Sequence, residues 1–237
     1  MDFNLTEERA MLRDMLRRFL GERYDHEARR KLIASGAAYD ADILIELAKL
    51  GVLGAMFSED DGGFGGTGFD LLVVFEELGR VGAIEPVLGS SVLAGGLLAE
   101  LGNASQKALI GQVISGATVL ALAHAEPQSR YDLSHVCTTA QADDGQIVLN
   151  GTKTHVINGA QAETLVVSAR ENGAKDDEVG ISLFLVPLAF EGVTCIGQHN
   201  VDDTSGARIV FDNVRLAKSD RLGKAGNAFA ALETATA

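Results

Sequence analysis

The sequence predicts a multidomain α+β protein, in which an all-α helical bundle is followed by an antiparallel β-barrel. Apolar residues recur at helical spacing up to about residue 117 and then give way to short β-branched runs. No helical segment separates those runs, which argues against a parallel α/β sheet. We therefore expect a helical domain at 1–117, a β-barrel domain at 118–222, and at 223–237 the start of a truncated C-terminal helical domain.

The helical part begins with a capped helix. Thr6 can cap a helix whose apolar residues lie on one face, and Gly21 is expected to end it. A second amphipathic helix is expected at 40–50. Thr67 and Asp70 have the spacing of a capping box in front of a third helix. Two further apolar segments are expected to complete the bundle: 90–102 and 106–116.

A glycine-rich loop precedes the third helix and resembles a dinucleotide-binding fingerprint. The loop at 63–68 has the pattern G-x-G-x-x-G. That fingerprint requires a strand before the loop, whereas both neighbours here are predicted to be helical. The acidic run at 59–61 would also repel a pyrophosphate. We interpret the loop as a flexible connection between helices.

The β-barrel is predicted from short runs that are bounded by turn residues. Asp144-Gly145 is a strong hairpin signal between two of them. The expected strands are 118–125, 135–141, 146–157, 163–170, 181–187, 192–198 and 207–216.

Composition and charge limit the functional classes. The formal charge of −13 argues against nucleic acid as a partner, because phosphate binding needs clustered Lys and Arg. No apolar run reaches the ~18 residues that span a bilayer. The acidic start lacks the order of a signal peptide, so a cytoplasmic protein is expected. Cys137 and Cys195 lie far apart and are expected to be two buried, inert thiols, with no metal site.

Five sequence blocks follow one another in a recognisable order. The first, SEDDGGFGGTGFDLLVVFEELGR at 58–80, resembles the glycine-rich loop and following helix of acyl-CoA dehydrogenases. The other four blocks lie at 96–127, 147–170, 180–193 and 207–223. AHAEPQSRYDL, at 123–133, resembles the small subunits of pimeloyl-CoA dehydrogenases, a bacterial branch that works as pairs of unlike subunits.

This resemblance implies a reaction, a cofactor and partners. The reaction is α,β-dehydrogenation of an acyl-CoA thioester, with hydride transfer to FAD held between the middle and C-terminal domains. The implied partners are acyl-CoA, an electron-transfer flavoprotein as acceptor, and a paralogous subunit in a homo- or hetero-oligomer. The family's catalytic carboxylate lies in the C-terminal bundle, and no Asp or Glu of this chain matches it. We therefore expect no catalytic residue here and little or no activity from the chain alone.

Two segments correspond to the flavin-contacting segments of the family. They lie at 122–132 and 153–159. The cofactor-binding residues that the resemblance implies are Leu122, His124, Ala125, Arg130, Tyr131, His155 and Ile157.

Both segments depart from the family pattern. The two hydroxyl-bearing Thr residues of most relatives are replaced by Ala125 and Ile157. The Trp that stacks on the flavin is replaced by His155, and a small Gly and Ser are replaced by Arg130 and Tyr131. Losses of about 1 kcal/mol per contact would weaken a cofactor site. The alternative function is therefore a non-catalytic structural subunit of a heteromeric acyl-CoA dehydrogenase.

Several of these residues also have structural interpretations. His155 is either a flavin contact or a half-buried polar residue of a strand. Arg130 is suited to bind an anionic phosphate or to pair with Asp132 or Glu126. Tyr131 is suited to stack on a ligand or to pack in a core.

Other charged residues are interpreted as structural. Lys153 is expected to be a surface charge, and Glu126-Pro127 a turn that ends a strand. Glu76 and Glu77 are adjacent on a helix and point about 100° apart, so we expect a solvated face or a helix-cap partner and no acid/base dyad.

Overall fold

The computed structural model describes residues 4–236, which separate into two compact units. A helical unit comprises 4–85 and 114–117. A second unit, which contains every strand of the described chain, comprises 86–113 and 118–236. The domain limits expected from the sequence stay a prediction.

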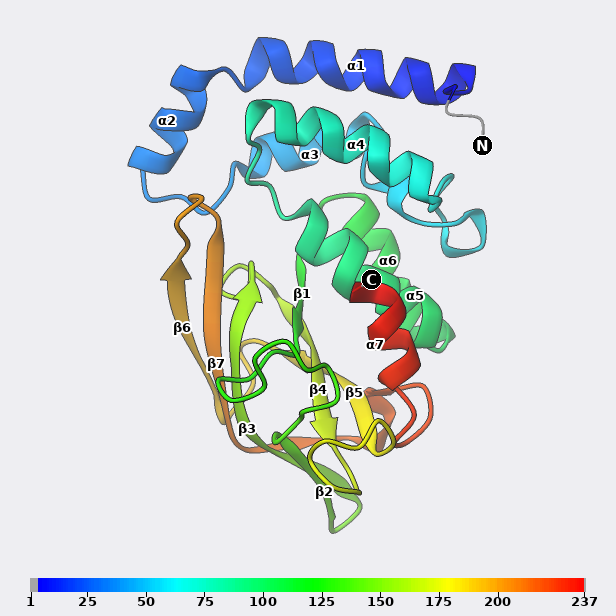
Figure 1. Ribbon diagram of the computed structural model, residues 1–237, viewed down its shortest axis with the longest axis vertical. Helices are drawn as coiled ribbons and strands as arrows, with labels where there is room; N and C mark the ends of the chain where they lie inside the picture. The colour runs from blue at the N-terminus through cyan, green and yellow to red at the C-terminus, as the bar shows by residue number, and fades with distance from the viewer. Residues whose placement is uncertain (1–3, 237) are drawn as a thin grey trace. The chain divides into compact units, whose positions relative to one another are not determined.

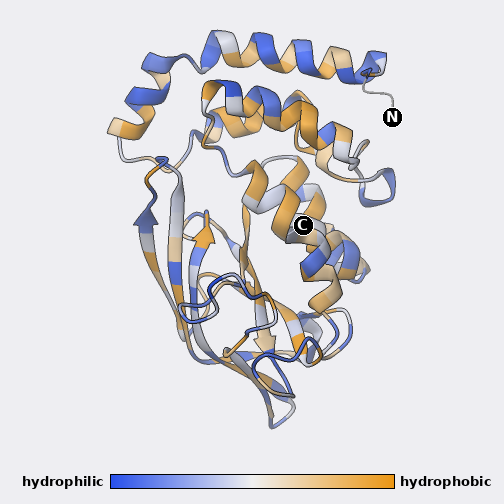
Figure 2. Cartoon of the chain, viewed as in Figure 1, coloured by the Kyte–Doolittle hydropathy of each residue, from blue (hydrophilic) through white to orange (hydrophobic). Residues whose placement is uncertain are grey.

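The helical unit is built on α1, which packs against α4 (Figure 1). Hydrophilic and hydrophobic residues alternate along α1, and its buried face carries Leu16 and Leu20 (Figure 2). The predicted cap at Thr6 is confirmed, since its side chain accepts a hydrogen bond from the backbone N–H of Arg9. The helices of this unit are α1 (Glu7–Arg23), α2 (His26–Ala34), α3 (Ala41–Lys49), η1 (Gly54–Met56), η2 (Glu59–Asp61) and α4 (Gly68–Val81).

Two boundaries differ from the expectation. Gly21 does not end α1, which continues to Arg23. A glycine ends a helix when it adopts a positive φ, and Gly21 does not. The helix α2 was not predicted, because most of its apolar residues gather at its end and none of its residues is buried, so no apolar face marks it.

The glycine-rich loop between η2 and α4 is packed closely against the backbone. It has helical neighbours on both sides, so the rejection of a dinucleotide fold is consistent with the structure. A Cβ on Gly63 would collide with the carbonyl oxygens of Phe57 and Gly54. The capping box is present, with the Thr67 N–H donating to Asp70 Oδ2 at 3.1 Å. The glycines of this loop therefore serve close packing more than flexibility.

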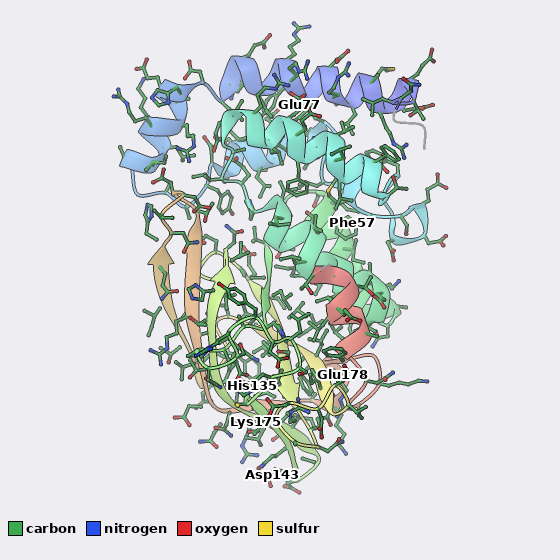
Figure 3. The ribbon with its side chains drawn as sticks, viewed as in Figure 1. Phe57, Glu77, His135, Asp143, Lys175 and Glu178 are labelled. Atoms are coloured by element: carbon green, nitrogen blue, oxygen red, sulfur yellow. The ribbon has the colours of Figure 1, made fainter. Side chains whose placement is uncertain are left out.

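Glu77 is buried, whereas Glu76 is exposed. The Glu77 side chain is labelled in Figure 3. Its carboxylate accepts hydrogen bonds from Arg17 Nη2 at 2.5 Å and from Arg80 Nε at 3.1 Å. The expected solvated face is therefore wrong for Glu77, because two guanidinium groups compensate the charge and allow its burial.

The second unit contains an eight-stranded sheet within residues 4–236, in the order β6-β7-β3-β2-β4-β5-β8, with β1 paired to β4 (Figure 1). All the predicted strands are present, and the two-residue β8 was not predicted. The strands are β1 (Leu120–Ala123), β2 (Thr139–Asp143), β3 (Gln146–Ile157), β4 (Thr164–Arg170), β5 (Ile181–Pro187), β6 (Val193–His199), β7 (Ser205–Leu216) and β8 (Arg221–Leu222).

The predicted antiparallel barrel is wrong, because the sheet is open and mixed. β1 runs parallel to β4, and a long connection that includes the β2–β3 hairpin joins them. β6 and β8 stand at the two ends of the described sheet, and no pair joins them to close it. The hairpin itself is confirmed, with Asp144 at φ 44° and Gly145 at φ 83° in its turn.

Helical segments of this unit flank the sheet. The π-helix η3 contacts β1 and α5, and α7 contacts α5 (Figure 1). The helical end predicted for the chain is present as α7. These segments are η3 (Val87–Ala94), α5 (Gly95–Leu101), α6 (Ala104–Ile114), η4 (Lys218–Asp220) and α7 (Phe229–Thr236). None of the helices within 4–236 is long and apolar enough to cross a membrane.

The expectation that both thiols are buried is wrong, whereas their inertness stays a prediction. Cys137 is exposed in the segment that precedes β2. Cys195 is only partly buried on β6, a strand at the edge of the sheet whose residues are mostly exposed. Both thiols are free.

Candidate functional site

The candidate site lies where the end of β1 meets the end of β3. The backbone N–H of Thr154 donates to the carbonyl of Ala125 at 2.8 Å, which joins the two segments. The backbone N–H of Leu120 donates to Ser90 Oγ at 2.9 Å, so η3 is attached to the start of β1. The segments 122–125 and 154–157 therefore lie side by side in one compact unit.

Lys153 is fully buried, with 0% of its surface exposed. Its Nζ donates to Glu126 Oε1 at 2.8 Å, to Ser168 Oγ at 2.9 Å and to the carbonyl oxygen of His124 at 3.0 Å. These three bonds use all three ammonium hydrogens. The expectation of a surface charge is wrong, because a buried carboxylate compensates the ammonium group from the segment beside it.

Glu126 is equally enclosed and holds the start of the β2 segment. Its carboxylate accepts from the backbone N–H groups of Thr138 at 2.8 Å and Cys137 at 2.9 Å. Burial alone would raise the pKa of Glu126, but the Lys153 charge and hydrogen bonds outweigh it, so the pKa lies below its ordinary value. Burial lowers the pKa of Lys153 to about 8, against the opposing effect of Glu126. Glu126 is thus a buried anchor as well as the predicted turn residue.

His124 extends this buried network toward a cavity. Its Nδ1 lies 2.9 Å from Ser168 Oγ, which already accepts from Lys153. The Ser168 hydroxyl is fully buried and can donate to Nδ1, so we assign the proton of the neutral ring to Nε2. Burial, with the Lys153 charge, lowers the pKa of His124 to about 4. The side chain is therefore a neutral imidazole at pH 7.

The structure brings all seven predicted cofactor-binding residues to two adjoining hollows. A cavity of about 160 Å³ has mainly apolar walls and two imidazole groups. It is lined by Gly89, Leu93, Leu122, His124, Ala125, His155, Ile157 and Thr236. A larger hollow of about 440 Å³ shares two of these residues and is more polar. It is lined by Ala125, Glu126, Pro127, Arg130, Tyr131, Thr154 and His155.

A backbone irregularity places His155 at both hollows. The register of β3 against β7 shifts between Lys153 and Val156. Within this irregularity His155 adopts φ 48°, which is uncommon for a residue other than glycine. Lys153 is buried and His155 is exposed, although alternation would place both on the same face of a regular strand. Because of this irregularity, the Lys153 side chain is buried while the His155 imidazole is exposed.

Arg130 and Tyr131 are exposed at the larger hollow. Arg130 also has a positive φ of 53° and forms no ion pair with any residue in the described range 4–236. Its expected pairing with Glu126 or Asp132 is therefore wrong, since Glu126 is engaged by Lys153 and Asp132 accepts from Ser134. Tyr131 is fully exposed, so packing in a core is wrong as well.

Sequence matches to known protein families identify the family of this chain. The acyl-CoA dehydrogenase N-terminal domain matches residues 6–117, and the acyl-CoA dehydrogenase middle domain matches residues 121–214. The chain belongs to the acyl-CoA dehydrogenase family. The finer resemblance to pimeloyl-CoA dehydrogenase small subunits stays a prediction.

Individual acyl-CoA dehydrogenases cover the chain almost completely. A short-chain specific acyl-CoA dehydrogenase of Clostridium acetobutylicum is 28% identical over 97% of this chain and 61% of its own length. Benzylmalonyl-CoA dehydrogenase of Aromatoleum aromaticum is 30% identical over 94% of this chain and 59% of its own length. The structure of butyryl-CoA dehydrogenase from Megasphaera elsdenii has a TM-score of 0.87 and 26% identity, over 99% of this chain and 63% of that one. The chain therefore spans about six-tenths of the length of these relatives.

The acyl-CoA dehydrogenase relatives and structural neighbours are FAD-binding flavoproteins. The site residues that the resemblance did not indicate are Ser168, Gly89, Leu93 and Thr236. Ser168 is the one polar residue between positions 165 and 169 of β4, which is the local sign of a buried hydrogen-bonding role. A Cβ on Gly89 would lie 3.0 Å from Asn158 Oδ1, so the absence of a side chain allows η3 to approach the end of β3.

Proposed function

We propose that this chain is part of an FAD-dependent acyl-CoA dehydrogenase, with its cofactor surface at the adjoining ends of β1 and β3. The observation that carries the proposal is the convergence of all seven expected residues on two neighbouring hollows. The whole reaction, its acyl-CoA substrate, an electron-transfer flavoprotein acceptor and a paralogous partner subunit belong to the same proposal.

The residues at the hollows fit the chemistry of FAD. The isoalloxazine is a flat apolar ring system with polar edges, and the smaller cavity combines Leu93, Leu122 and Ile157 with two imidazoles. The cofactor also carries a pyrophosphate, and Arg130 offers an exposed guanidinium that no other described residue neutralises. When bound, FAD supplies the hydride acceptor for α,β-dehydrogenation of the thioester.

His155 and His124 have different roles at the proposed cofactor surface. His155 is exposed at both hollows and is placed to hydrogen-bond or stack against the cofactor. His124 is neutral and fixed by Ser168, so it presents an imidazole of defined tautomer to the smaller cavity. The Lys153–Glu126 pair beneath them keeps both segments in place.

The function is tested with the full-length protein loaded with FAD under anaerobic conditions. Saturated acyl-CoA thioesters of increasing chain length are added, and the absorbance of oxidised flavin is recorded. We expect bleaching with at least one of these thioesters, because a dehydrogenase passes hydride from substrate to flavin. Retained absorbance with every thioester, with and without co-expressed paralogous subunits, contradicts a catalytic role.

A second candidate is a non-catalytic subunit that supports a catalytic paralogue. The specific observation in its favour is that Ala125 and Ile157 bring no hydroxyl group to the smaller cavity. FAD binding without bleaching by the protein alone, combined with increased activity of the paralogue in its presence, would favour this candidate.

A further inference from the structure

A cysteine, a histidine and an aspartate form a hydrogen-bonded row apart from the proposed cofactor residues. His135 Nδ1 lies 2.5 Å from Asp176 Oδ1, and His135 Nε2 lies 3.5 Å from Cys137 Sγ. The Cys137 thiol is exposed, and the Asp176 side chain is 57% exposed. In Figure 3, His135 lies close to Lys175, the neighbour of Asp176 in the chain. The row therefore joins two segments that are distant in sequence and is open to solvent.

Buried Arg170 fixes these two segments against each other. Its guanidinium donates to the carbonyl oxygens of Ser134 at 2.8 Å and Val136 at 3.1 Å, on either side of His135. It also donates to the carbonyls of Lys175 at 3.0 Å and Asp177 at 2.8 Å, on either side of Asp176. The row is therefore held by a rigid backbone support rather than by a chance contact of two surface side chains.

The Asp176 carboxylate determines which nitrogen of His135 carries the proton. An ionised Asp176 can only accept a hydrogen bond, so it holds the proton of neutral His135 on Nδ1. The lone pair on Nε2 then faces the Cys137 thiol, which is the arrangement of a nucleophile, a base and an orienting acid. Asp176 and Cys137 approach opposite nitrogens of one ring, and residues 4–236 contain no cluster arranged to hold a metal ion.

The amides beside the thiol limit its chemistry. The N–H groups of Cys137 and Thr138 both donate to the Glu126 carboxylate, at 2.9 and 2.8 Å. Neither amide is available to stabilise the oxyanion of an acyl-transfer reaction. Thiol–disulfide exchange passes through no oxyanion, so it is compatible with these occupied amides.

We propose that Cys137 is a reactive thiol, deprotonated by His135 and positioned by Asp176, that exchanges with small-molecule disulfides. His135 Nε2 accepts the proton from Sγ, and the thiolate attacks one sulfur of the disulfide. The disulfide bond of the small molecule breaks as the mixed disulfide forms on Cys137. The released thiolate takes the proton back from the imidazolium, so Cys137 is oxidised and half of the small molecule is reduced.

The charged groups around Cys137, His135 and Asp176 compensate one another. Buried Lys153 interacts favourably with a thiolate at Cys137, while the Glu126 carboxylate is already engaged by Lys153 and two amides. Asp132 is a second carboxylate that interacts with His135, in addition to Asp176. An imidazolium–thiolate pair is therefore compatible with its surroundings.

The chain contains only one other cysteine, which serves as an internal reference. Burial raises the pKa of the Cys195 thiol. The full chain is incubated with oxidised glutathione at neutral pH, and adducts are assigned by intact mass and peptide mapping. We expect Cys137 to be modified at least about tenfold faster than Cys195, because it is more exposed and has the His135 imidazole beside it to accept its proton. Equal rates at the two cysteines overturn the proposal.

Variants of His135 and Asp176 distinguish activation of the Cys137 thiol by the histidine from reactivity that is due only to exposure of the thiol. His135→Ala and Asp176→Asn are each expected to slow modification of Cys137 by about tenfold, whereas Asp176→Glu retains most of the rate. His199→Ala and Asp203→Asn alter an exposed His/Asp pair of the same type, 4.0 Å apart, and are expected to leave the rate unchanged. Asp176 is largely exposed, so its variants test the proposal even if His135→Ala does not fold. An unchanged rate in Asp176→Asn shows that exposure alone explains the reactivity and overturns the relay.

Discussion

Lys153→Met is expected to lower the free energy of unfolding by about 3–5 kcal/mol, because it leaves the Glu126 carboxylate buried without its counter-ion. Lys153 is fully buried, and its Nζ makes three hydrogen bonds, one to Ser168 of β4 and two to His124 and Glu126 in the segment that follows β1. The methionine side chain fills similar space but donates none of these bonds. Urea denaturation, monitored by circular dichroism, measures the loss.

Two comparisons make this prediction specific. Glu126→Gln in the Lys153→Met background is expected to recover part of the loss, because an uncharged amide is less costly to bury. The exposed pair of Lys49 and Glu46 is the matched control, and Lys49→Met should cost less than about 1 kcal/mol. A loss in Lys153→Met no greater than that of Lys49→Met would contradict the buried pair.

The second large effect is a dependence on pH that arises from His124. Its pKa in the folded state is about 4, below the ordinary 6.5. Between these values the unfolded chain binds a proton at this residue and the folded chain does not, so acid favours unfolding. We expect His124 alone to remove about 3 kcal/mol of stability as the pH falls from 6.5 to 4, at about 1.4 kcal/mol per unit of pKa. Above pH 6.5 its contribution is constant.

His124→Gln removes this titration and keeps a hydrogen-bonding side chain beside Ser168. Between pH 6.5 and 4, the unfolding free energy of the variant should therefore change less with pH than that of the wild type. The difference between the two slopes corresponds to one proton fewer taken up on unfolding. The groups that face His124 are the Lys153 ammonium, the Glu126 carboxylate and the Leu133 carbonyl, and all remain in the variant. His199→Gln, at an exposed position, should leave the slope unchanged. A parallel pH dependence in His124→Gln and wild type would show that His124 is accessible to protons in the folded state.

Much of the fold could be predicted because its signals are local. The strands were recognised from β-branched runs, and the β2–β3 hairpin from Asp144-Gly145. Closure of the sheet could not be recognised in this way. It depends on which strands pair across long connections, such as β1 with β4, and on whether β6 and β8 meet. Those choices are set by packing in three dimensions and leave no periodic signal.

The candidate site was likewise predicted only in part. The seven residues at the two hollows were expected from the resemblance to a family. The burial of Lys153 was not, because a lysine in a strand is usually exposed and its carboxylate partner lies 27 residues away. The Cys137–His135 contact is local, but the orienting Asp176 lies 41 residues from His135 and reaches it only through the support of Arg170.

The binding of FAD to the full-length protein tests the central claim most directly. Fluorescence titration should give a measurable dissociation constant for the wild type. His155→Ala is expected to raise it about tenfold, which corresponds to ~1.4 kcal/mol, because this side chain faces both hollows. His199→Ala removes an exposed histidine of β6 and should leave the constant unchanged. If His155→Ala binds FAD as tightly as the wild type, or if the wild type binds none, the ends of β1 and β3 are not the cofactor surface.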